Sequence, residues 1–267
     1  MEFEALLTAL LCVLQLSLGI YGFNVDIGSA VVYDGPAKSE YFGYSVALHS
    51  HQNKFWVIVG APLSNVTNAL DASDTLTRYG AVYKCQYTGS KTPCKVINID
   101  NRPVNRDLVT LNNVPNVWVD LEEKSGQWLG GTVHSTGTNG KALVQLCASR
   151  YIYRGRPPSP DQDLQYRWLL GKCFLISGDL SVTTAHREPC FLESKGNNHY
   201  GYCQAGFSAE YTVDGYDVIM GTVGVKRWKG IHFAYVCWLW DGAVAYIVSA
   251  CTPDQAVGFK SWLRLCS

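Results

Sequence analysis

The fold is decided by two consecutive stretches, Tyr41-Phe42-Gly43-Tyr44-Ser45-Val46-Ala47-Leu48 and Phe55-Trp56-Val57-Ile58-Val59-Gly60-Ala61-Pro62. In the first, an aromatic-glycine pair opens a run in which apolar and polar residues alternate. The second is a more continuous apolar run that closes on Gly-Ala-Pro, and the short polar segment 49–54 separates the two. Alternating runs bounded by glycine and proline are typical of β-strands. We therefore predict a β-hairpin over residues 41–62.

The same pattern occurs twice more in the chain. The second copy is 127–133 followed by 141–148, and the third is 204–209 followed by 216–223. The marker positions are 17 residues apart in the first two copies, Gly43 to Gly60 and Gly130 to Cys147, and 15 apart in the third, Gly206 to Gly221. Each copy leads into a further predicted strand, at 80–83, 171–175 and 228–231. Such regular spacing indicates a repeat architecture.

These copies resemble the FG-GAP repeats of integrin alpha subunits. Further stretches carry the resemblance: Phe23-Asn24-Val25-Asp26, Gly35-Pro36, Gln127-Trp128-Leu129-Gly130 and Cys203-Gln204-Ala205-Gly206-Phe207-Ser208. The run 42–62 is most similar to the alpha-four/alpha-nine branch. The resemblance implies an all-β fold, an incomplete β-propeller with about three FG-GAP blades of an expected seven, each blade being a four-stranded sheet.

The repeats divide the chain into three parts. Residues 1–22 are apolar after a short start and indicate a signal peptide, although this start carries two glutamates and no Lys or Arg; a buried helix and a signal anchor are the alternatives. Residues 23–230 form the partial propeller, in which 23–33 is expected to be a strand that closes the ring. Residues 231–267 are a divergent tail. We expect an outer strand of the third blade followed by unrelated sequence there, with a transmembrane helix as the alternative.

Between the repeats the sequence is polar and irregular. We expect long loops over 86–126, 152–168 and 177–200, with 122–125 as a solvated turn. Asn139-Gly140 favours a tight hairpin turn because both residues tolerate positive φ. A second turn is expected at 213–216.

Six cysteines fall into three close pairs, while Cys12 lies in the predicted signal peptide and Cys237, Cys251 and Cys266 lie in the tail. A zinc site is the competing interpretation, but it needs CxxC or histidine partners at short spacing, and none is present. Spacing alone cannot give connectivity. The integrin resemblance implies sequential disulfides, which are Cys85–Cys94, Cys147–Cys173 and Cys190–Cys203. Asn65-Val66-Thr67 is the only N-x-S/T sequon, so we predict glycosylation at Asn65.

Charge and motifs exclude several function classes. Lys plus Arg equal Asp plus Glu, so there is no electrostatic case for nucleic-acid binding. No nucleophile elbow, phosphate loop or Asp-x-Asp-x-Asp calcium loop occurs, and we expect no catalysis and no metal. His49 and His51 share one strand face and are expected to be exposed rather than to hold a metal. The resemblance places calcium only in later blades.

The resemblance also implies two binding regions. Tyr44, Trp128 and Phe207 match the aromatic cage that holds a basic residue of the integrin beta subunit; packing between blades is the alternative role. Residues 193–200 and 225–228 match ligand-facing loops, with Glu193, Arg227 and Trp228 as candidate contacts. The acidic pair of Arg-Gly-Asp-binding members is absent, so that specificity is doubtful.

The expected function is that of an integrin alpha chain fragment, a non-enzymatic cell-adhesion receptor. It would bind extracellular-matrix or cell-surface protein ligands together with a beta subunit, in the secretory pathway and at the cell surface. The alternatives are an accessory domain of a secreted phospholipase-type enzyme, and a secreted scaffold or soluble competitor.

Overall fold

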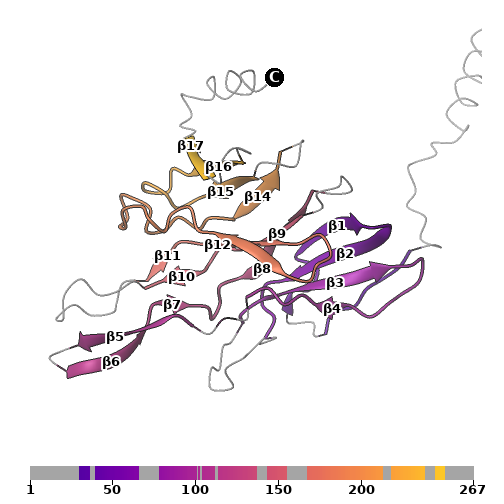
Figure 1. The fold of residues 1–267 in the computed structure, drawn as a ribbon, viewed down its shortest axis with the longest axis horizontal. Helices are drawn as coiled ribbons and strands as arrows, with labels where there is room; N and C mark the ends of the chain where they lie inside the picture. Colours follow the sequence, from indigo (N-terminus) through magenta and orange to yellow (C-terminus); the bar gives the residue numbers. More distant parts are fainter. Residues whose placement is uncertain are drawn as a thin grey trace, which may run out of the picture. The chain divides into compact units, whose positions relative to one another are not determined.

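The computed structural model describes residues 30–36, 40–65, 78–100, 102, 104–111, 114–136, 143–154, 167–212, 218–237 and 244–249. The chain divides into two units, 1–32 and 33–267. The predicted signal peptide lies outside the described residues, and so do the predicted turns at 138–141 and 213–216. Every regular element of the described residues is a β-strand (Figure 1). None of them forms a helix with the length and apolar character needed to cross a membrane.

The first predicted hairpin is confirmed and belongs to a four-stranded antiparallel sheet, which we call blade 1. Its strands lie in the order β1 (Ser45–His51), β2 (Lys54–Ala61), β3 (Ala81–Tyr87) and β4 (Lys95–Val96). The polar segment at 52–53 makes the tight turn, where Gln52 and Asn53 both adopt positive φ. Asn is among the residues that tolerate this conformation best.

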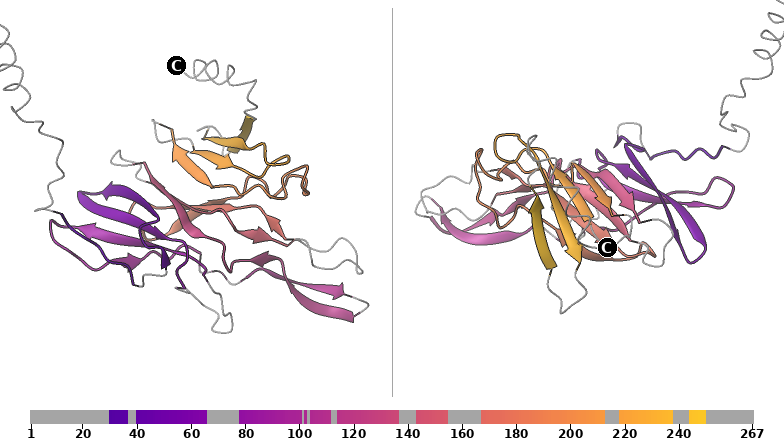
Figure 2. Two further views of the ribbon diagram at one scale, coloured as in Figure 1. Left: turned by 180° about the vertical axis from the view of Figure 1, so that it is seen from behind. Right: turned by 90° about the horizontal axis from the view of Figure 1, so that it is seen from above.

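The other two copies form sheets of the same kind. Blade 2 has the order β8 (Leu129–Ser135), β9 (Val144–Ala148), β12 (Lys172–Ile176) and β13 (Thr183–Arg187). Blade 3 has the order β14 (Ser208–Tyr211), β15 (Val218–Thr222), β16 (Ile231–Cys237) and β17 (Val244–Ser249). Figure 2 shows the three sheets from two further sides. An all-β fold with propeller-type blades is thus established.

The repeat alignment is confirmed by strand register. Ser45 pairs with Gly60 in blade 1, Thr132 with Cys147 in blade 2, and Ser208 with Gly221 in blade 3. The marker positions therefore occupy equivalent places in the three hairpins. Any residue of one blade can be compared with its counterparts through this register.

Neighbouring blades share apolar cores. Ile58 and Val82 of blade 1 are fully buried in one cluster with Leu129, Leu146 and Phe174 of blade 2. A second cluster joins blades 2 and 3 and contains Leu170, Cys173, Ala205, Val218 and Met220. Burial of apolar area between sheets is the main stabilising term for such repeats, because a single blade cannot bury both of its faces.

The expectation of a long loop over 86–126 is wrong. This segment contains β4, the hairpin β5 (Arg106–Leu111) with β6 (Val114–Asp120), and β7 (Glu122–Glu123). Its polar composition gave no sign of these strands, because the hairpin is mostly exposed and buries few side chains. Pro115 is tolerated near the start of β6, where a two-stranded sheet leaves one side of each strand unpaired.

The other loop predictions are also partly wrong. Residues 152–168 contain β10 (Ile152–Tyr153) and the start of β11 (Trp168–Leu169), which join β7 in a three-stranded sheet. Residues 177–200 contain β13, the outer strand of blade 2. In the segment 231–267, β16 and β17 are the third and fourth strands of blade 3, so this blade continues beyond residue 230.

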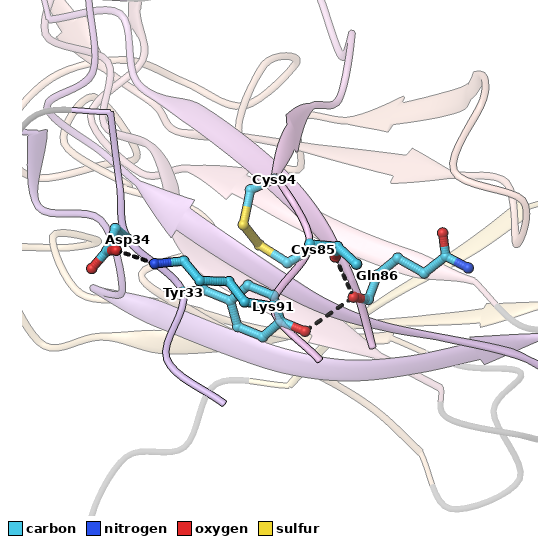
Figure 3. Close-up of a disulfide and its surroundings, with 7 residues drawn as sticks. Tyr33, Asp34, Cys85, Gln86, Lys91 and Cys94 are labelled. Carbon is cyan, nitrogen blue, oxygen red and sulfur yellow. Dashed lines mark hydrogen bonds and ion pairs between the residues drawn. A yellow bond between two sulfur atoms is a disulfide. The ribbon is translucent and has the colours of Figure 1, made fainter. Parts of the chain in front are cut away.

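The strand predicted over 23–33 is absent from its described part, because residues 30–33 pair with no described strand. Tyr33 instead donates a hydrogen bond from its hydroxyl to the Gln86 carbonyl (3.0 Å), and Asp34 pairs with Lys91 (Figure 3). Side-chain contacts to β3 and to the β3–β4 connection therefore hold Tyr33 and Asp34.

Three disulfides join the cysteines in the sequential pattern, Cys85–Cys94, Cys147–Cys173 and Cys190–Cys203. The first joins β3 to the residue before β4 within blade 1, and the second joins β9 to β12 within blade 2. The third closes the loop that precedes blade 3. A zinc site made of these residues is excluded, because their sulfur atoms are bonded to one another.

Candidate functional site

Each blade has an equivalent turn at or just before the start of its first strand, and we call these turns, 41–44, 128–131 and 204–207, the rim turns. Tyr41, Trp128 and Gln204 open them with φ of 55°, 68° and 52°. In each turn the fourth residue donates its backbone N–H to the carbonyl of the first, at 3.0, 3.0 and 3.2 Å. The repeated sequence thus places three turns of one conformation at the same end of three blades.

Two of the predicted cage residues are brought together. The Tyr44 and Trp128 rings lie 5.7 Å apart between centroids at 82°, an edge-to-face contact across the junction of blades 1 and 2. Tyr44 is 55% exposed, so this contact leaves much of its ring open to solvent. Tyr41 stacks on Tyr44 at 6.4 Å and extends the cluster. Sequence reasoning missed Tyr41, although it begins the same aromatic-glycine stretch.

Trp128 is the first residue of its rim turn, whereas Tyr44 is the fourth residue of its own. Tyr44, Gly131 and Phe207 are equivalent, and a Cβ on Gly131 would lie 2.3 Å from Trp128 Cδ1. The indole therefore occupies the space that the side chain at position 131 would fill. Phe207 is 60% exposed, and no ring contact joins it to Tyr44 or Trp128 among the residues described.

A cation of this chain already lies against the cage. The Arg150 guanidinium carbon is 5.3 Å from the centre of the Trp128 ring, within cation–π range. Arg150 is held there because its backbone N–H donates to the Gln127 carbonyl at 3.0 Å. One face of the Trp128 ring is therefore already in contact with a guanidinium group of the same chain.

The two predicted ligand-facing loops lie side by side. Backbone N–H groups of Lys226 and Arg227 donate to the carbonyls of His199 (2.8 Å) and Asn197 (3.0 Å), and Arg227 Nε donates to Asn198 Oδ1 at 2.6 Å. The loop between blades 2 and 3 is therefore fastened to the loop that precedes β16.

Side chains of these loops differ in exposure. Trp228 is 64% exposed and stacks on Tyr202 at 6.3 Å. Glu193 is half-buried, and its carbonyl accepts a hydrogen bond of 2.6 Å from Lys195 Nζ. Burial lowers the pKa of Lys195, whose ammonium also donates to the Cys190 carbonyl at 3.0 Å. Trp228 and Arg227 are thus presented to solvent, whereas Glu193 helps to hold the loop.

A buried charge network beneath the rim was not foreseen. Residues 122–125 were expected to be a solvated turn, and this is wrong: the Lys124 side chain is 1% exposed and its ammonium lies 2.9 Å from Asp100 Oδ2. Burial would raise the pKa of Asp100, but the Lys124 and Arg102 charges outweigh it and lower that pKa. Burial and the neighbouring Glu122, which accepts from the Tyr151 hydroxyl, raise the pKa of Tyr151. The local sequence around Lys124 could not reveal this network, because the residues that pair with it come from segments distant in the sequence.

A cavity of about 820 Å³ opens beside this network. Its lining includes His186 and Lys172, which is buried against Glu188 at 2.7 Å, and burial lowers the pKa of His186. Phe191 and Leu192 of the loop between blades 2 and 3 also line it, and Leu192 is 90% exposed. The cavity therefore offers both charged and apolar surface next to the predicted ligand-facing loops.

His49 was expected to be exposed, and this is wrong. It is 2% exposed and lies at the junction of blades 1 and 2, with Nδ1 2.9 Å from Ser135 Oγ and Nε2 2.7 Å from the Gly178 carbonyl. Among the described residues no group of three or more His, Cys, Asp or Glu side chains could hold a metal ion. Asn65 is exposed just after β2 and accepts a hydrogen bond from the Arg78 backbone at 2.8 Å. Its glycosylation stays a prediction.

Comparison with known proteins supports the resemblance. No family model matches the chain. Rat integrin alpha-7 is 33% identical over 218 residues, which are 79% of this chain and 17% of that protein. Mouse integrin alpha-8 is 32% identical over 230 residues (83% and 20%), and Drosophila integrin alpha-PS2 is 31% identical over 234 (82% and 15%).

These relatives do not support the alpha-four/alpha-nine branch, which stays a prediction. The chain spans about a fifth or less of the length of the relatives it matches. Its repeats, strand register and sequence relatives identify it as a homologue of integrin alpha subunits, corresponding to three propeller blades.

Proposed function

We propose that this chain is the blade-forming part of an integrin-alpha-type adhesion receptor, and that its rim turns bind an integrin beta subunit. The observation that carries the proposal is the exposed aromatic contact between Tyr44 and Trp128 across two blades. Aromatic rings combine a large apolar area with faces that attract cations, so this cluster suits a basic side chain of a partner. Phe207 would extend the same surface on blade 3.

The protein ligand is proposed to bind the loops 193–200 and 225–228, which are hydrogen-bonded to each other. Tryptophan and arginine are enriched at the energetic centres of protein interfaces, and both Trp228 and Arg227 are exposed there. The neighbouring cavity gives a matrix or cell-surface protein a place to insert a side chain. Glu193 is proposed to act by shaping the loop. We infer no catalytic role.

The proposed location is the cell surface, reached through the secretory pathway. Three disulfides fit this location, since such bonds persist in oxidising compartments. Calcium binding is proposed only for later blades of a complete receptor.

The test is binding of the purified chain to a soluble integrin beta ectodomain, measured by biolayer interferometry. Tyr44→Ala and Trp128→Ala are each expected to weaken binding by about 30-fold or more, the effect of losing a central aromatic anchor. Phe55→Ala is the matched control, because Phe55 is 53% exposed on the same hairpin but at its opposite end. Equal losses in all three variants, or none, would reject the rim as the binding surface.

A further inference from the structure

The bend at residues 190–193 follows β13, the outer strand of blade 2, and leads into the proposed ligand-facing loop 193–200. It places two apolar side chains in solvent, because Phe191 is 39% exposed and Leu192 is 90% exposed. Single exposed apolar residues are common on protein surfaces, so exposure alone indicates nothing. What distinguishes this bend is the set of contacts that hold its backbone.

The ammonium of Lys195 is hydrogen-bonded to three backbone carbonyls of the bend. Lys195 Nζ donates to the Cys190 carbonyl at 3.0 Å. The carbonyls of Phe191 and Glu193 accept from the same nitrogen, each at 2.6 Å. An ammonium has three N–H donors, so the donor capacity of this side chain is used within one bend. Hydrogen bonds from a charged donor are stronger than those between neutral groups, and Lys195 therefore fixes the direction of three carbonyls.

The start of the bend is attached to the body of the protein. Cys190 forms a disulfide with Cys203, and both residues are buried. The Phe191 N–H donates to the Glu188 carbonyl at 3.0 Å, and the Glu188 carboxylate pairs with the buried Lys172 at 2.7 Å. The start of the bend is therefore fixed, and the conformation of the residues that follow depends on the contacts of Lys195.

Phe191 and Leu192 both line the cavity beside the charge network. The Phe191 ring packs edge to face on Tyr153, with 4.8 Å between ring centroids and 63° between the rings. Apolar side chains that are held in solvent become buried when a partner covers them, and this burial favours binding. The bend thus presents two apolar side chains at the cavity that is proposed to receive a side chain of the ligand.

We propose that Lys195 is a positioning residue of the ligand site, because its ammonium holds the bend in the conformation in which Phe191 and Leu192 contact an apolar side chain of the protein ligand. This inference rests on the ligand role proposed above for the loops 193–200 and 225–228. A bend that is ordered before binding loses little conformational freedom when the ligand binds. Loss of the ammonium should therefore weaken ligand binding although Lys195 itself does not touch the ligand.

The first test examines the bend in the free full chain by limited proteolysis with chymotrypsin, which cleaves after Phe and Leu. Protease reaches such sites when the segment opens locally. Lys195→Met keeps an unbranched side chain and removes the ammonium, so it should raise the rate of cleavage after Phe191 and Leu192 by about tenfold. Lys195→Arg keeps a charged donor and should restore most of the resistance. Lys91→Met is the control, because Lys91 is 58% exposed on blade 1.

The second test measures ligand binding by the chain paired with a soluble integrin beta ectodomain. Laminin, fibronectin and collagen are immobilised separately as probes. Leu192→Ser should weaken binding to the recognised matrix protein by about tenfold, since an apolar contact is lost and the core is not altered. Lys195→Met should weaken it to a similar extent, and Lys195→Arg should restore it in part. Val182→Ser is the control, because Val182 is 58% exposed on the β12–β13 connection.

Affinity for the beta ectodomain separates this inference from the proposed receptor function. It is measured first for every variant and should not change, because no rim turn is altered. A wild-type chain that does not bind the beta ectodomain would reject the rim surface, whereas the cleavage rates would still test the role of Lys195.

Three results would overturn the inference. Unchanged cleavage after Phe191 and Leu192 in Lys195→Met would reject the positioning role, and so would cleavage throughout the chain, because Lys195 would then be needed for the whole fold. Matrix binding that is unaffected by Leu192→Ser would reject the contact with the ligand. A wild-type pair that binds none of the three matrix proteins would reject it as well.

Discussion

His49 is kept neutral by its surroundings. The Gly178 carbonyl can only accept, so Nε2 carries the proton and Nδ1 accepts from Ser135. Burial, with a smaller contribution from His51, lowers the pKa of His49 below its usual 6.5. As pH falls below about 6.5, His49 therefore becomes protonated in the unfolded chain while it stays neutral in the folded chain.

The free energy of unfolding should consequently decrease as pH is lowered from 7.5 to 5.5. The contribution of His49 to this decrease is up to about 1.4 kcal/mol per pH unit. Urea denaturation at a series of pH values measures it. His49→Gln should flatten the pH dependence, whereas His199→Gln, at an exposed position, should leave it unchanged. An identical slope in all three proteins would show that His49 does not set it.

Arg150 occupies a face of the Trp128 ring, which belongs to the surface that we propose binds a beta subunit. Its guanidinium lies 5.3 Å from the Trp128 ring centre, and an exposed cation–π contact contributes about 0.5–1 kcal/mol. Arg150→Ala should therefore strengthen binding of a beta subunit by about two- to five-fold, because the ring is freed and a like charge is removed. Arg78→Ala, at another exposed arginine, is the control in the same titration. Weaker binding by Arg150→Ala would mean that Arg150 itself contacts the partner.

Lys124 illustrates why part of the site escaped prediction. Its sequence neighbours are charged, which is typical of a solvated turn, but Asp100 comes from a segment more than twenty residues earlier and pairs with it in the interior. Lys124→Ala should lower the free energy of unfolding by about 3–5 kcal/mol, since it leaves a buried carboxylate without its partner. Lys91→Ala, which removes a pair that is more than half exposed, should change it by less than about 1 kcal/mol. Chemical denaturation compares the two, and similar small effects would contradict the buried pair.

At the scale of elements, the contact between blades depends on close backbone approach. Gly80 has φ of 86° and bridges to Leu129 of the next blade. Gly80→Ala should therefore cost more than the about 1–2 kcal/mol expected for strain at positive φ alone. Gly89→Ala is the matched control, with φ of 79° and no atom within 4 Å of the added Cβ. Equal losses in thermal denaturation would show that the blades do not pack at Gly80.

Elements with a repeated apolar pattern could be predicted, and elements without one could not. β1, β2 and β3 follow directly from alternating runs bounded by glycine and proline, and their counterparts in blades 2 and 3 follow from the recurrence of the pattern at a spacing of 17, 17 and 15 residues. β5 and β6 escaped because an exposed hairpin has few apolar residues, and its register depends on pairing rather than burial. Tyr44 and Trp128 could be placed together only through the integrin resemblance, because the repeat aligns Tyr44 with Gly131 and not with Trp128. No local sequence pattern indicates that Arg150 contacts Trp128.

At the scale of the whole molecule, the three rim turns lie at one end of their blades, and the hairpin turn at 51–54 lies at the opposite end of blade 1. This separation makes the proposed receptor role testable without any substitution. A partner that binds the rim must cover residues 41–44, 128–131 and 204–207 together.

The most direct measurement is hydrogen–deuterium exchange of the full chain with and without a soluble integrin beta ectodomain. We predict slower exchange in the peptides that contain the three rim turns, and unchanged exchange at 51–54. Protection confined to 51–54, or no protection at a saturating concentration of the beta ectodomain, would contradict the assignment of the rim as the beta-subunit surface.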